Sequence, residues 1–268
     1  NFTLRFRPKQ VFNTENEFWN RWMFQQNISA SNSLRKEGTT LEWNPFTNSA
    51  QILGKTRSIR SSIFFNQGTQ YKWSSNFIYN QQQSQTYVYT GSEYRDSDSY
   101  LLQTRYKILQ DLIASFDTEY MVINSDSELF LSRRYKLNNL RLSPKITYQT
   151  EKNLVASLFY NYQNKKNVSG EEQLNQSDLG TEIQWNSSDK MSLLGSFSFI
   201  NNKFIGNQES VVGNQMMEGL RAGNNFVWQL QIQRQITSFL QLNISYDGRK
   251  TEENKPIHTG SVQVQARF

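Results

Sequence analysis

The last 45 residues of the chain alternate apolar and polar side chains over three consecutive stretches, 224–236, 239–250 and 257–268. A period of two is typical of a β-strand whose two faces meet different environments. The apolar face is continuous, carries aromatic residues at its ends and finishes on a phenylalanine. The pattern therefore predicts strands of a transmembrane β-barrel, with lipid outside and a polar lumen inside. The apolar positions are Phe226, Trp228, Leu230, Ile232, Leu240, Leu242, Ile244, Tyr246, Val262, Val264, Ala266 and Phe268.

The composition agrees with a barrel better than with a soluble domain. Only 36% of the 268 residues are hydrophobic, yet 14% are aromatic. A barrel reconciles these values, because only one face of each strand must be apolar. No run of about 18 apolar residues is present, so no helical membrane span is predicted. The absence of cysteine excludes disulfides, thiol catalysis and thiolate metal sites.

The formal charge of +6 raises the question of a nucleic-acid partner. A nucleic-acid-binding module concentrates its basic residues on one element, whereas here they are scattered along the chain. We therefore expect no nucleic acid among the partners.

The same alternation continues upstream and predicts about thirteen strands in an all-β, up-and-down antiparallel barrel. Tight turns join the strands in pairs, and longer polar connections are expected at the other ends, over 81–98, 124–138, 164–176, 201–223 and 251–256. Short turns on one side and long loops on the other are typical of bacterial outer-membrane barrels. The connection 8–17 and a folded loop around Trp43–Phe46 are also expected, since Pro45 disfavours an interior strand. The predicted strands are 2–7, 18–31, 57–66, 70–80, 98–109, 111–123, 137–149, 153–164, 177–186, 190–201, 224–236, 239–250 and 257–268.

Aromatic residues are sorted to the two ends of the predicted strands, as expected for side chains at the two membrane interfaces. One set falls at the end with the tight turns: Phe65, Tyr71, Tyr106, Tyr148 and Trp185. The other set falls at the opposite end: Tyr79, Tyr100, Tyr120, Tyr162, Phe199, Phe226 and Tyr246.

Two features of the C-terminal region resemble known outer-membrane proteins. The last strand, with its terminal Phe268, resembles the signal read by the barrel assembly machinery. The run from Glu218 to Asn225 before the Trp228 strand, the stretch 246–249 (YDGR) and the stretch 258–260 (HTG) resemble the C-terminal end of large Bacteroidota-type outer-membrane barrels. This resemblance implies a bacterial outer-membrane location. The partners it implies are membrane lipid and lipopolysaccharide, the assembly machinery, and further outer-membrane or periplasmic subunits. It carries over no functional residue.

His258 is the single histidine, and it falls near the outer rim. A hydrolase on a barrel would use such a histidine with a nucleophile, but no nucleophile motif accompanies it. Carboxylates in the predicted outer loops can bind a divalent cation or serve as solvated charge: Asp96, Asp98, Asp126, Glu128, Glu171 and Glu172. We assign no catalytic, cofactor-binding or metal-binding residue.

Two groups of charges have predicted positions. Basic residues at the outer rim lie where lipopolysaccharide phosphates would be: Arg133, Arg134, Lys165, Lys166, Lys203 and Arg249. Charges of both signs are expected to face the lumen: Arg60, Lys72, Arg105, Lys107, Asp117, Glu119, Arg141, Lys145, Glu182, Asp247 and Arg267.

The sequence therefore predicts a single barrel domain over 1–268 that serves as a channel, transporter or translocation component, and not as an enzyme. The alternatives are a non-conducting scaffold for partner proteins and an outer-membrane hydrolase. Closure of an antiparallel barrel needs an even number of strands, so about fourteen are expected. The missing strand is expected upstream of Asn1, together with any N-terminal domain, or else within 32–56.

Overall fold

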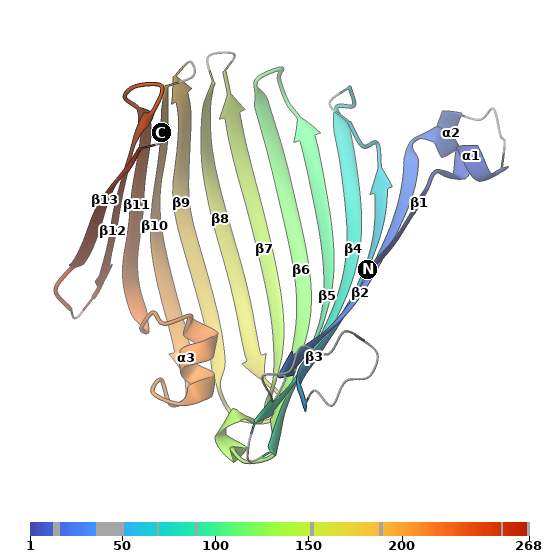
Figure 1. Cartoon of the computed structure of the whole chain (residues 1–268), viewed down its shortest axis with the longest axis vertical. Coiled ribbons are helices and arrows are strands. Elements are labelled where there is room, and N and C mark those ends of the chain that lie inside the picture. The colour runs from blue at the N-terminus through green and yellow to red at the C-terminus, as the bar shows by residue number, and fades with distance from the viewer. Residues whose placement is uncertain are drawn as a thin grey trace, which may run out of the picture.

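The computed structural model describes the chain except for residues 13–16, 36–50, 69, 89–90, 151–152, 188–189, 253 and 267–268. Within the described residues thirteen strands form one antiparallel sheet in which each strand pairs with its neighbours in sequence (Figure 1). The strands are β1 (Phe2–Phe6), β2 (Trp22–Arg35), β3 (Gln51–Phe65), β4 (Trp73–Val88), β5 (Gly91–Lys107), β6 (Leu112–Ser127), β7 (Tyr135–Gln149), β8 (Leu154–Asn167), β9 (Gln173–Ser187), β10 (Met191–Ile205), β11 (Gly223–Gln235), β12 (Leu240–Thr251) and β13 (Ile257–Ala266).

The connections differ in kind at the two ends of the sheet (Figure 1). At one end, called the turn end, the strands are joined by tight turns such as the one in which the backbone N–H groups of Ile108 and Leu109 both bond to Leu112 O. At the other end, called the loop end, lie the short helices η1 (Leu131–Arg133) and α3 (Val211–Met217). All thirteen predicted strands are confirmed, and so is the asymmetry of the connections except between β4, which ends at Val88, and β5, which begins at Gly91.

Several predicted boundaries at the loop end are wrong. The expected loop 81–98 is almost entirely strand, since β4 runs to Val88 and β5 starts at Gly91. Similarly, β10 continues to Ile205, and the expected loop 201–223 contains α3. Backbone pairing continues where both faces are polar, so the apolar alternation marks only part of each strand.

The beginning of the chain also departs from the prediction. The connection 8–17 holds the helix α1 (Pro8–Phe12), and Phe18 belongs to the helix α2 (Glu17–Asn20) rather than to a strand. The second strand starts only at Trp22. Residues 32–35 and 51–56 extend β2 and β3, while the loop expected around Trp43–Phe46 lies outside the described residues.

The register of the sheet collects the alternating side chains on two distinct faces. Tyr79, Tyr100 and Tyr120 stand opposite one another on three successive strands, and Ile244 stands opposite Val262. A shift by one residue would send each of these side chains to the other side, so the shared register preserves one apolar face and one polar face. The predicted facing of the strands is thus confirmed.

Aromatic side chains mark two rows on the apolar face. In the row near the turn end, the Phe65 ring centroid lies 4.8 Å from that of Trp22 and 5.4 Å from that of Trp73. In the second row, called the loop-end row, the Tyr79 and Tyr100 rings are 5.1 Å apart. The strands continue beyond the loop-end row, because β4 extends past Tyr79 as far as Val88.

The sheet is not closed on itself within the described residues. The pairing order runs from β1 to β13, and β1 and β13 are not paired with each other. The expected additional strand upstream of Asn1 stays a prediction. Among the helices of the described part, none is long and apolar enough to cross a membrane.

Candidate functional site

The polar face of the sheet is a continuous surface of amide, hydroxyl and charged side chains bonded across neighbouring strands. Asn80 donates to Ser99 Oγ at 3.3 Å, and Gln103 donates to Asp117 Oδ2 at 3.1 Å. Further along the sheet, Asn161 donates to Asp178, the Thr147 and Ser157 hydroxyls are 3.1 Å apart, Gln176 donates to Asn202, and the Ser245 and Ser261 hydroxyls are 2.8 Å apart. Such a surface can exchange its hydrogen bonds with water and with polar solutes.

Two ion pairs join strand residues on this face. Arg141 Nη2 is 2.7 Å from Glu119 Oε2, and Lys145 Nζ is 2.7 Å from Glu182 Oε2. The sequence placed these four residues on one face but did not predict the pairs. Pairing reduces the cost of holding charges of both signs close together on one wall.

The other predicted polar-face charges have varied surroundings. No ion pair is found within the described residues for six of them: Arg60, Lys72, Arg105, Lys107, Asp117 and Asp247. Lys72 lies in the turn before β4, and Arg267 lies outside the described residues. Asp178, which the sequence analysis missed, accepts a hydrogen bond from Asn161 at 3.0 Å.

Helix α3 packs onto the polar face near the loop end. Val212, Met216 and Met217 are buried together with strand residues Leu137 and Leu174. The cluster is completed by Tyr135 and by the partly buried Ile123, Phe204 and Ala222. Leu137 and Leu174 occupy positions whose side chains lie on the polar face. The alternation of apolar and polar residues is therefore interrupted where α3 covers the strands. Two signals in the sequence could have predicted the helix: the leucines at these polar-face positions, and the apolar pairs Val211–Val212 and Met216–Met217.

The ends of α3 are fixed by hydrogen bonds. Ser210 Oγ accepts from the Gly213 N–H at 2.9 Å and caps the first turn. At the last turn, Lys165 from β8 donates to Met216 O at 2.8 Å and pairs with Glu218 at 2.6 Å. A cation at this end also suits the helix dipole. Lys165, predicted as an exposed rim charge, is only 7% exposed and instead anchors the helix.

Gly213 lets the helix approach its own loop closely. A Cβ at this position would lie 2.4 Å from Asn207 O and 3.1 Å from Phe204 Cζ. The loop is tied to the following strand by Asn225, a fully buried side chain that donates to Arg221 O at 2.9 Å. The segment 206–222 is therefore an ordered element that is fixed to the sheet at both of its ends.

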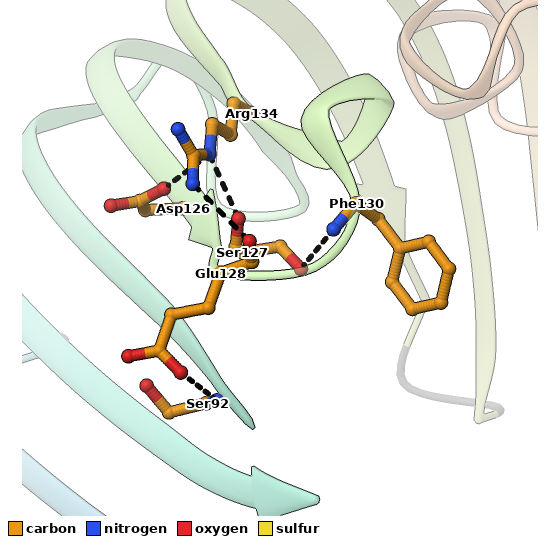
Figure 2. A network of polar contacts seen from close by, with 6 residues as sticks. All are labelled: Ser92, Asp126, Ser127, Glu128, Phe130 and Arg134. Carbon is orange, nitrogen blue, oxygen red and sulfur yellow. Dashed lines mark hydrogen bonds and ion pairs between the residues drawn. The ribbon is translucent and has the colours of Figure 1, made fainter. Parts of the chain in front are cut away.

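The connection 128–134 forms a second ordered loop, and its helix η1 lies against α3. Figure 2 shows Arg134 at the centre of its contacts: the side chain donates to Ser127 O at 2.8 Å and pairs with Asp126 at 3.0 Å. Glu128 reaches the neighbouring strand and accepts from the Ser92 N–H at 2.7 Å. We call the segments 206–222 and 128–134 together the cap.

The predicted outer carboxylates do not gather into one site. Asp98 accepts from the Tyr79 hydroxyl at 2.8 Å, and Glu172 accepts from Asn167 at 2.8 Å. Asp126 pairs with Arg134, and Glu128 accepts from the Ser92 N–H of β5, as described above. Among the described residues, no group of three histidine or acidic side chains is arranged to hold a metal ion.

His258 lies on the apolar face, among aromatic side chains. Its Nδ1 is 2.8 Å from the Tyr246 hydroxyl, the two rings are stacked, and the Trp228 ring centroid is 5.6 Å away. Gly248, paired with His258, leaves space for the Trp228 indole, since a Cβ there would lie 2.0 Å from it. The histidine thus extends the loop-end row and points away from the polar face.

None of the protein-family models matches the chain, and none of the curated protein sequences does. Among solved structures, the translocator domain of the autotransporter NalP from Neisseria meningitidis is 14% identical, with 92% of this chain and 88% of that chain covered and a TM-score of 0.35. OmpT of Vibrio cholerae is 6% identical, with 86% and 88% covered and a TM-score of 0.43. CdiB from Acinetobacter baumannii is 11% identical, with 92% and 51% covered and a TM-score of 0.47. The likeness concerns strand arrangement alone, and the function below rests on this chain's own residues.

Proposed function

We propose that this chain is the wall of a bacterial outer-membrane β-barrel, and that its polar face lines a channel narrowed at the loop end by the cap. The observation that carries the proposal is the position of α3. The helix packs on the polar face, where a closed barrel has its lumen, and it is anchored there by Lys165.

The two faces of the sheet support this role. The apolar face exposes large side chains to its surroundings, with Val262 69% and Val264 60% exposed. Such a surface is unfavourable in water and favourable against lipid. Backbone groups within the sheet are paired between strands, as a bilayer requires.

Transport is favoured over a purely structural role by the chemistry of the polar face. A lining of amides, hydroxyls and paired charges supports the water-filled space that a transport path requires. The cap covers part of the polar face at the loop end, so the cap should limit the flow of ions.

Single-channel recording in planar bilayers tests the proposal. Replacement of residues 207–221 by a three-residue Gly-Ser-Gly linker should raise the conductance of the purified protein, because it removes α3 from the polar face. Lys165→Met should produce more frequent transitions to a higher conductance, since the helix loses its anchor. Lys190→Met is the matched control, because this exposed lysine lies in a turn at the opposite end.

Two results would contradict the proposal. The absence of conductance in the wild type and in the cap variant alike would favour the scaffold. Equal conductance with and without residues 207–221 would show that the cap lies outside the ion path.

A further inference from the structure

Four lysines lie on the apolar face at the loop end of their strands: Lys136 on β7, Lys166 on β8, Lys203 on β10 and Lys250 on β12. We call them the lysine belt. On its own strand, each lysine lies four residues from another residue of the apolar face. These residues are Leu140 for Lys136, Tyr162 for Lys166, Phe199 for Lys203 and Tyr246 for Lys250. An even separation keeps both side chains on the same face of a strand. The distance along the strand is about 13 Å, and less along the membrane normal once the strand tilts.

The lysine belt is exposed to the surroundings of the apolar face. All four residues are exposed, and none forms an ion pair with another described residue. Three other basic residues of the rim differ: Lys165 is buried and paired, while Arg133 and Arg134 are paired with Glu93 and Asp126. The register thus separates neighbours such as Lys165 and Lys166, which the sequence had grouped together.

The cross-strand neighbours leave the positive charge of the belt uncompensated. Lys136 stands opposite Asn124, and Lys203 stands opposite Asn175. Lys166 stands between Asn138 and Gln173, and Lys250 stands opposite Phe226. None of these neighbours is a carboxylate, so the belt presents four positive charges toward whatever surrounds the apolar face.

The lysine belt lies on β7 to β12, and the apolar face also carries the exposed Arg57 on β3, which stands opposite Gln83. At the corresponding positions of β4 and β5, four residues beyond Tyr79 and Tyr100, stand Gln83 and Asp96. The belt extends from β7 to β12, a width of about 24 Å at the usual spacing between strands. A partner that binds the belt as a whole is therefore anionic and contacts several strands at once.

We propose that the lysine belt binds the phosphate groups of lipopolysaccharide in the outer leaflet. This inference rests on the proposed function, since it needs the apolar face in lipid and the loop end at the cell surface. Lysine side chains near an interface extend their ammonium groups toward the headgroups while their methylene stems cover apolar surface. A phosphorylated disaccharide headgroup carries several negative charges and is wide enough to reach lysines on more than one strand.

Native mass spectrometry of the purified protein in detergent tests the assignment without depending on conductance. The probes are diphosphoryl lipid A and the same lipid without its phosphates. The wild type should bind the diphosphoryl form more tightly. Replacement of all four lysines by glutamine should abolish this preference, and the single variants Lys166→Gln and Lys203→Gln should each weaken binding about fivefold. These single variants keep the test valid if the fourfold variant does not fold.

The control variant removes four positive charges from the polar face instead. In it Arg60, Arg105, Lys107 and Arg249 are all replaced by glutamine. Arg249 is adjacent to Lys250 but faces the other way, so this control variant should bind diphosphoryl lipid A as the wild type does. Three results would overturn the proposal: equal affinity of the wild type for both lipids, an equal loss of binding in the control, or undiminished binding in the lysine variants. Displacement by inorganic phosphate as effective as by lipid A would likewise overturn the assignment to a lipid.

Discussion

Ile244 and Asn243 are neighbours on β12, but their side chains lie on opposite faces of the sheet. Ile244 stands between Ile232 and Val262, so its surroundings are apolar on both sides. Asn243 stands between Gln233 and Gln263. A residue-level test of facing can therefore compare two adjacent positions in the same strand.

Arginine at position 244 should lower the free energy of unfolding by roughly 2–4 kcal/mol, because it places a charge on the lipid side. Asn243→Arg should have little effect, since its side chain enters a polar environment. The measurement is denaturant unfolding in lipid vesicles. Similar losses for the two variants would contradict the assignment of the faces.

Gly213 permits the close packing of α3, and alanine there should loosen the cap. The added Cβ would press on Asn207 O, a backbone atom that cannot rotate away. We expect a cost of about 1–3 kcal/mol, the usual range for an overpacked site. Protease cleavage within 206–222 should become faster. Gly195→Ala is the control, because the nearest atom to its added Cβ is 4.0 Å away; cleavage as slow in Gly213→Ala as in the control would contradict the packing role.

At the scale of elements, the sequence predicts the strands well and their ends poorly. The alternation that includes Tyr79 and Tyr100 reflects contact with an apolar environment, and it stops where that environment stops. Hydrogen bonds between strands need no such pattern. Pairing therefore continues through polar residues, so that β4 ends only at Val88 and β5 begins already at Gly91. The full length of a strand is thus decided by its neighbours rather than by its own sequence.

Helix α3 was missed for a related reason. Its apolar residues are few and irregularly spaced. They form a buried cluster only because the fold brings Leu137 and Leu174 together from strands that are distant in sequence. Lys165 and Lys166 illustrate the same limit. Both were predicted at the rim, but only the register shows that one anchors the cap and the other belongs to the lysine belt.

The last strand provides a prediction at the element scale that concerns assembly. Phe268 lies outside the described residues, and its role is inferred from the resemblance of the C-terminal strand to an assembly signal. Phe268→Asp should lower the amount of folded protein in the membrane more than it lowers the stability of the folded fraction. Heat-modified mobility on gels measures the first quantity, and denaturant unfolding measures the second. Normal membrane levels of the variant would contradict the prediction.

At the scale of the whole molecule, one arrangement accounts for the faces, the cap and the lysine belt. The apolar face with its two aromatic rows fits a lipid layer of limited thickness. The polar face, covered at one end by α3, fits an aqueous path. The belt lies just beyond the apolar part of the outer surface, where anionic headgroups are expected.

Cysteine scanning of β12 tests this arrangement most directly, because the natural chain contains no cysteine. Single cysteines at positions 241–245 are introduced in the membrane-inserted protein and exposed to a charged, water-soluble maleimide. The account predicts fast labelling at 241, 243 and 245 and slow labelling at 242 and 244. Uniform labelling along the strand, or fast labelling at 242 and 244 with protection of the other three, would contradict it.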